Sequence, residues 1–167
     1  MIRKRMIQPN IWQDEDFGLL SPLAQLVYIG CITQADDEGR LIGHPAVIKS
    51  TLFPYGLVTL EQVFDALQEI IAKNRNFVYY EVDKNYYIQF KKWLKYQHIR
   101  DDRKIKSTFP PQSADTSPQS AAEVKESKVK ESKVKDGSGQ LPAKNQVLDN
   151  LRKNLEEKGI IKKTKLL

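Results

Sequence analysis

The sequence predicts a small α+β domain in which helices precede a two-stranded β-hairpin. Three observations lead to this prediction. Residues 59–73 carry a helix-capping pattern followed by apolar residues at helical spacing. Residues 77–82 and 86–90 are aromatic and β-branched, and the short turn 83–85 separates them. Two earlier segments, which begin near residues 21 and 44, also carry helix start signals.

The elements before the hairpin can be placed in order. Ser21-Pro22 has Ser at the N-cap and Pro at the first helical position, and the apolar run to residue 32 predicts a helix buried on more than one side. Arg40–Ile42 is a short strand candidate that would pair with the hairpin. His44-Pro45 begins a second helix, which Pro54-Tyr55-Gly56 ends.

The third helix begins at Thr59, and Gln62 completes a capping box. One face of this helix is apolar: Val63, Phe64, Leu67, Ile70 and Ile71. Helix, strand, helix, helix, strand, strand is the order of a winged helix-turn-helix. We therefore expect three helices packed on a small three-stranded antiparallel sheet, with one shared core.

The N-terminal segment and the first turn are strongly charged. Arg3, Lys4 and Arg5 form a basic arm that we expect to contact DNA phosphates. Trp12 is expected to fill the core, with stacking on a nucleic-acid base as the alternative. The acidic run 36–38 lacks the ligand spacing of a calcium loop, so it is interpreted as a solvated turn.

Cations and aromatic residues alternate after the hairpin. Residues 91–106 contain seven cationic residues and two aspartates. Such a stripe is typical of nucleic-acid binding, although a packed extension with solvated lysines is the alternative. We expect Trp93 to pack on the domain and the cations to contact phosphate: Lys91, Lys92, Lys95, Arg100, Arg103, Lys104 and Lys106. Lys49 and the hairpin lysine Lys84 are further candidate backbone contacts.

The C-terminal third divides into a linker and a tail. The domain with its basic extension is expected to span residues 1–106. Residues 107–141 are rich in Pro and Ser and contain a short lysine-rich repeat, which predicts a disordered linker. In the tail, 142–167, an apolar stripe predicts a short amphipathic helix that docks on its own domain or on a partner: Val147, Leu148, Leu151 and Leu155.

Several functional classes lack their residue patterns here. The sequence contains no phosphate-binding glycine loop and no nucleophile motif, so we expect no enzyme activity and no cofactor. His44 and His98 have no companions at ligand spacing, and Cys31 is the single cysteine, so neither a metal site nor a disulfide is expected. The basic N-terminus leads to Gln8-Pro9-Asn10 rather than an apolar signal, and no apolar run would span a membrane, which favours a cytoplasmic protein.

The third helix has a charge that does not suit a DNA groove. Glu61, Asp65 and Glu69 are spaced four residues apart and form one acidic stripe. Carboxylates would be repelled by the phosphates that line a major groove, although Glu can accept a hydrogen bond from cytosine. We therefore expect this face to contact a basic protein surface rather than to read bases alone.

A family resemblance rests on several stretches of this sequence. They are residues 1–7, 11–12, 20–26, 35–40, 52–55 and 80–89. Together they resemble the N-terminal winged-helix domain of phage and prophage replication proteins, relatives of the DnaD-type replisome organisers. The resemblance covers about residues 1–106. It implies origin DNA binding in replication initiation, self-association into a homo-oligomer, and recruitment of a replicative helicase or its loader in the bacterial host cytoplasm.

Three functional hypotheses follow. The first is a replication-initiation protein that binds double-stranded DNA, with single-stranded DNA as an alternative, mainly through backbone phosphates. The second is a prophage transcriptional regulator that reads an operator with its third helix. The third is a protein-binding winged helix that serves only assembly, which the acidic stripe favours and the basic stripe does not.

Overall fold

The computed structural model describes residues 4–112 and 144–161. Within these ranges the fold is mixed α+β, with six α-helices, two short 3₁₀ helices and one three-stranded antiparallel sheet. The elements are η1 (Pro9–Gln13), α1 (Glu15–Gly18), α2 (Pro22–Gln34), β1 (Arg40–Ile42), α3 (Pro45–Leu52), α4 (Leu60–Lys73), β2 (Phe77–Val82), β3 (Asn85–Phe90), α5 (Trp93–Tyr96), η2 (Asp101–Arg103) and α6 (Lys144–Glu157).

The sheet has the strand order β1-β3-β2, so the short first strand pairs with the hairpin as the sequence predicts. On the central strand, Ile88 lies opposite Leu41 of β1 and opposite Tyr79 of β2. The hairpin turn places Asp83 and Lys84 at φ values of 50° and 62°. Two consecutive residues with positive φ are typical of the tight turn that follows the twist of an antiparallel pair.

The predicted helix starts are confirmed. Thr59 Oγ1 accepts a hydrogen bond from the Gln62 amide (3.2 Å), and Gln62 Oε1 accepts one from the Thr59 amide (2.8 Å), which completes the capping box. Ser21 caps α2, with Pro22 at its first position. His44 caps α3 through its Nδ1, which accepts from the Ala46 amide.

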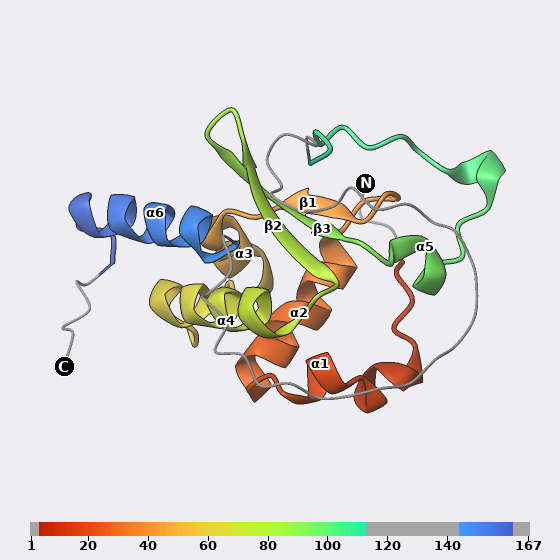
Figure 1. Cartoon of the computed structure of the whole chain (residues 1–167), viewed down its shortest axis with the longest axis horizontal. Helices are drawn as coiled ribbons and strands as arrows, with labels where there is room; N and C mark the ends of the chain where they lie inside the picture. The colour runs from red at the N-terminus through yellow and green to blue at the C-terminus, as the bar shows by residue number, and fades with distance from the viewer. Residues whose placement is uncertain (1–3, 113–143, 162–167) are drawn as a thin grey trace, which may run out of the picture.

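The core lies between the helices and the sheet. Helices α2 and α3 both pack against α4, and α4 packs against β2. In Figure 1 the hairpin tip projects at the top, α6 lies beside α4 and β2 on the left, and α5 lies at the right. An aromatic cluster joins these layers: Phe17, Tyr28, Phe77, Phe90 and Trp93. Each aromatic ring buries a large apolar area, so these rings contribute strongly to the stability of the core.

Two parts of the fold differ from the sequence prediction. Trp12 is 65% exposed and touches the core only through an edge-on contact with Phe17, so its expected core filling is wrong. Residues 107–112, expected to belong to the linker, lie against the sheet: Arg40 donates to the Phe109 carbonyl (2.9 Å) and Tyr80 to the Pro110 carbonyl (2.8 Å). The rest of the predicted linker, 113–141, lies outside the described residues.

Candidate nucleic-acid interface

Helix α5 is fixed to the domain through Trp93. This side chain is 5% exposed, and its ring stacks on Phe90 with 5.7 Å between centroids. Its indole N–H donates to the Asp37 carbonyl (3.2 Å), which satisfies the one polar atom of the ring. Gly39 permits this contact, because its φ is +78° and a Cβ there would lie 2.6 Å from the Trp93 ring. The expected packing of Trp93 is therefore confirmed.

Gln97 joins the end of α5 to the N-terminal segment. Its side-chain amide accepts from the Met6 backbone (3.0 Å) and donates to the Met6 carbonyl (2.7 Å). Gln8 adds a bond to the Tyr96 carbonyl (3.2 Å). These contacts hold residues 6 and 8 beside the end of α5, and Lys4, which precedes them, is exposed.

The cations of the predicted stripe lie on the surface of this fixed segment. Residues 91–106 are called the basic segment, and its exposed cations are Lys91, Lys92, Lys95, Arg100, Arg103, Lys104 and Lys106. Arg100 pairs with Asp102 at 3.0 Å, but both side chains are more than half exposed, so the pair holds Arg100 only weakly. Exposed cations on a backbone that is held in place are suited to contact phosphates.

Arg5 is not part of an exposed arm. Its guanidinium forms a 2.9 Å ion pair with Asp37, and the two side chains are 5% and 3% exposed. It also donates to the Ala35 carbonyl (2.9 Å) and lies over the Trp93 ring. A guanidinium committed to these partners holds the N-terminal segment in place, so the geometry removes Arg5 from the candidate phosphate contacts. Arg3 lies outside the described residues.

The acidic turn 36–38 binds the returning chain, and its interpretation as a solvated turn is wrong. Asp37 accepts from the Ile105 amide (2.9 Å), and Glu38 accepts from the Ser107 amide (3.2 Å). Asp36 accepts from the Ser107 hydroxyl. These bonds fasten the far end of the basic segment, as Trp93 fastens its beginning. The sequence gives no local signal for them, because the partners are about seventy residues apart.

Lys49 and Lys84 are not brought into the basic segment. Lys84 lies in the hairpin turn, at the opposite end of β3 from Lys91. A six-residue strand is about 20 Å long, so Lys84 and Lys91 cannot contact the same phosphate or two adjacent phosphates. Lys49 is half-buried near the end of α3.

The acidic stripe of α4 contacts the protein itself. Glu69 accepts from the Ser21 amide (2.9 Å) and hydroxyl (2.6 Å) and pairs with Lys73 (2.7 Å). Burial raises the pKa of Glu69, but the bonds from Lys73 and Ser21 outweigh it, and the net pKa is below its ordinary value. Asp65 pairs with Arg152 of α6 at 3.3 Å. Glu61 is half-buried.

Helix α6 docks on its own domain, along α4 and β2. Leu148, Leu151 and Leu155 of the predicted stripe are 1%, 4% and 5% exposed, and Val147 is half-buried. Arg152 lies over the Phe64 ring and donates to Gln68 as well as pairing with Asp65. Of the two expectations for the tail, docking on its own domain is the one that the structure shows.

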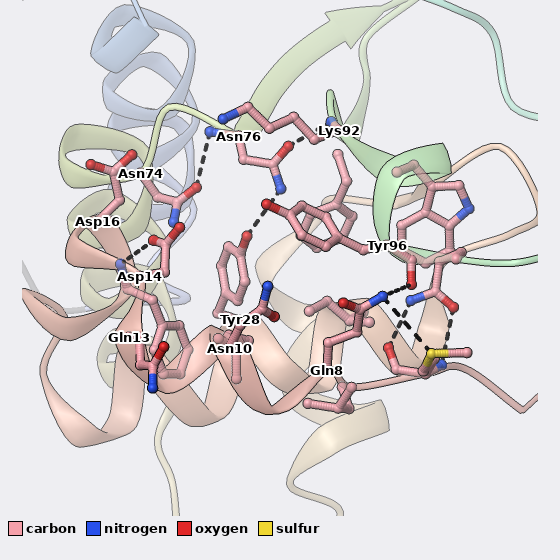
Figure 2. A pocket seen from close by; sticks show the side chains of 18 residues that line it. Gln8, Asn10, Gln13, Asp14, Asp16, Tyr28, Asn74, Asn76, Lys92 and Tyr96 are labelled. Atoms are coloured by element: carbon pink, nitrogen blue, oxygen red, sulfur yellow. Dashed lines mark hydrogen bonds between the residues drawn. The ribbon is translucent and has the colours of Figure 1, made fainter.

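A cavity of about 330 Å³ lies between the N-terminal segment and α5 (Figure 2). Asn76 organises one side of it: its side-chain N–H donates to the Tyr28 hydroxyl (3.2 Å), and its oxygen accepts from the Lys92 amide (2.7 Å). Burial raises the pKa of Tyr28 to about 12, so this group is a neutral phenol at pH 7. Sequence reasoning missed the cavity, because its walls come from the N-terminal segment 6–17, α2, the turn 74–76 and the segment 90–97.

The described residues contain no group of three or more His, Cys, Asp and Glu side chains that could hold a metal ion. Burial and nearby Lys158 lower the pKa of His44, which caps α3. No helix within residues 4–112 and 144–161 is long and apolar enough to cross a membrane.

Comparison of the chain with protein-family models, curated proteins and solved structures gave no match.

Proposed function

We propose that this chain is a winged-helix protein that binds duplex DNA through its phosphates and acts in replication initiation. The order α2-β1-α3-α4-β2-β3 supports the winged-helix part of the proposal, since α3 and α4 would form the helix-turn-helix and the β2–β3 hairpin the wing. Fold alone does not specify the ligand, so the proposal depends on the surface chemistry.

The basic segment is the observation that supports DNA binding. Its beginning is held by Trp93, its middle by Gln97 and its end by Ser107, so its cations extend from a fixed backbone. Its two aspartates leave a local charge of +5. Preordered cations lose less conformational entropy when they bind phosphate than cations on a flexible tail do.

The docked α6 argues against operator reading by α4. In a helix-turn-helix the second helix of the motif enters the major groove with its exposed side. Here α6 lies along α4, Arg152 forms an ion pair with Asp65, and Glu69 accepts hydrogen bonds from Ser21. Phosphate contact by the basic segment therefore suits this arrangement better than direct base reading by α4.

A role in replication initiation is the part of the proposal that rests on the sequence resemblance. In that role the chain would self-associate and bind a replicative helicase or its loader. A protein-binding assembly module is the second candidate function, because the leucine contact between α6 and α4 is the kind of helix-in-groove contact that such modules use.

The salt dependence of duplex affinity tests the proposal. The full chain is titrated with a random-sequence duplex at several salt concentrations, alongside a Lys91→Ala, Lys92→Ala, Lys95→Ala variant. Each phosphate contact contributes about 0.9 to the slope of log affinity against log salt, so the variant should lower the slope by about two to three.

A charge-matched variant controls for net charge. Lys49→Ala, Lys84→Ala, Lys153→Ala removes three cations elsewhere and should change the slope by about one unit or less. Equal losses in both variants would mean that affinity follows net charge and not the basic segment. If the wild-type chain binds no duplex at low salt, DNA binding is wrong and the assembly module is the better candidate.

A further inference from the structure

We propose that the cavity between the N-terminal segment and α5 binds a nucleobase, with the adjoining phosphate on Lys92. The base would come from a single-stranded DNA segment or from a free nucleotide, which share this chemistry. The DNA source rests on the proposed function, whereas the free-nucleotide source does not. The cavity volume of about 330 Å³ is at the lower end of the range for small-molecule sites, about 300–1,000 Å³.

Aromatic rings form the walls of the cavity. Tyr28 meets Phe90 edge-on, with 5.4 Å between centroids and an interplanar angle of 90°, and Phe90 stacks on Trp93. Tyr96 and Phe17 complete the aromatic lining. Phe90 and Trp93 are 2% and 5% exposed and pack on each other, so they form a closed wall of the cavity. Tyr96 is the half-buried ring of this lining, and a nucleobase would stack there.

Two of the side-chain amides that line the cavity are not bonded to other described residues of the protein. Asn10 and Gln13 line the cavity from η1, and among the described residues neither amide has a protein hydrogen-bond partner. Figure 2 shows them coming from the N-terminal segment at the bottom, with Asn76 and Lys92 at the top. An amide offers a donor beside an acceptor, which matches the donor and acceptor edge of a base such as adenine.

The two carboxylates that line the cavity are already bonded to the protein. Asp14 accepts from the Phe17 amide (2.9 Å), and Asp16 accepts two bonds from the Arg75 guanidinium (3.1 and 3.2 Å) and one from the Arg75 amide (3.3 Å). The Arg75 hydrogen bond holds the pKa of Asp16 below its ordinary value. Lys92 lies nearby, and no hydrogen bond within residues 4–112 and 144–161 holds its ammonium group. It is therefore available for a phosphate.

One short stretch supplies both the walls and the cations. Phe90, Trp93 and Tyr96 line the cavity, while the intervening Lys91, Lys92 and Lys95 are exposed. A nucleotide whose base enters the cavity beside Tyr96 would leave its phosphate near these lysines. This alternation within seven residues connects the cavity to phosphate chemistry and distinguishes it from an ordinary packing defect.

Trp93 provides a fluorescent probe for the test. Only two tryptophans are present, and Trp12 can be removed as Trp12→Phe because it is largely exposed. In this background the full chain is titrated with deoxyadenosine monophosphate, with a single-stranded oligonucleotide and with the matching duplex. Saturable quenching of Trp93 by the nucleotide or by the single strand is the expected result.

Two variants locate the contacts. Asn10→Ala, Gln13→Ala should weaken nucleotide or single-strand binding about tenfold and leave duplex affinity unchanged. The control Gln146→Ala, Asn154→Ala removes two exposed amides from α6 and should leave both affinities unchanged. Lys92→Glu should weaken the binding of deoxyadenosine monophosphate. The binding of deoxyadenosine, which lacks the phosphate, should not change.

The outcomes separate this inference from the proposed function. If the chain binds duplex but neither the nucleotide nor the single strand quenches Trp93, the base site is overturned. The proposed DNA binding would then stand. Quenching by the free nucleotide in a chain that binds no DNA would support the site and overturn the proposed function. Quenching by the single strand alone assigns the base to DNA. Equal losses in the amide variant and its control would overturn the site.

Discussion

Arg5 and Asp37 form an ion pair inside the domain, with 2.9 Å between guanidinium nitrogen and carboxylate oxygen and side chains that are 5% and 3% exposed. The pair joins the N-terminal segment to the turn between α2 and β1. Asp37 also holds the Ile105 amide, and its carbonyl holds Trp93, so three separate chain segments meet at this residue. Removal of the Asp37 side chain should therefore also weaken the attachment of the N-terminal segment and of residue 105.

Asp37→Ala leaves the Arg5 charge buried without its partner, and we expect a loss of about 3–5 kcal/mol in the free energy of unfolding. Arg100→Ala is the control, since it removes an exposed ion pair and should cost less than about 1 kcal/mol. Urea denaturation followed by circular dichroism measures both. Similar small losses in the two variants would contradict the buried pair.

The hydrogen bonds of Glu69 predict a pH-dependent contribution to stability. Because the folded-state pKa lies below the ordinary value of 4.5, the carboxylate stabilises the fold above that value. The contribution is lost as pH falls through the folded-state pKa. Glu69→Gln should therefore be less stable than wild type at pH 7, and the difference should shrink in acid.

Urea denaturation at pH 7 and at about pH 3 compares Glu69→Gln with wild type. Glu157→Gln is the control, because this carboxylate is exposed on α6. A deficit for Glu69→Gln that is as large in acid as at neutral pH would show that the charge of the carboxylate does not matter.

The docking of α6 predicts a local effect from its buried leucines. Leu151 is 4% exposed, and Leu→Ala in a packed site costs about 2–5 kcal/mol. An isolated helix of 14 residues is marginal in water, so weakened docking should expose its amides. Leu151→Ala should lower the hydrogen-exchange protection of α6 and leave α2 protected. Asn150→Ala, on the exposed side, should leave α6 protected, and equal protection in both variants would contradict the docking.

Local signals predicted the elements, and long-range contacts account for what they missed. Thr59 and Gln62 predict the start of α4, because a capping box is a contact between residues only three positions apart. Arg5 looked like part of an exposed arm, since nothing near it in sequence shows that Asp37 lies opposite. For Asp65 and Glu69 the sequence predicted contact with a basic protein surface, but helical spacing does not reveal that the partners are Arg152 and Ser21 of the same chain. The cavity needs four distant segments, so no single stretch indicates it.

Gly39 connects the stability of the fold with the candidate DNA surface. Gly39→Ala would force a side chain into a residue at φ +78° and place its Cβ 2.6 Å from Trp93, so we expect a loss of more than about 1 kcal/mol in stability. Because Trp93 must shift, α5 and its lysines should also move. In conditions where the variant is still folded, duplex affinity should fall and its salt slope should flatten.

Gly18→Ala is the matched control, because a Cβ at that position meets no atom within 4 Å. It should change stability by less than about 0.5 kcal/mol and leave duplex affinity unaltered. Urea denaturation and the duplex titration measure both variants. If Gly39→Ala is destabilised but binds duplex with the wild-type salt slope, the position of α5 is irrelevant to phosphate contact, and the cations that hold DNA must lie elsewhere on the chain.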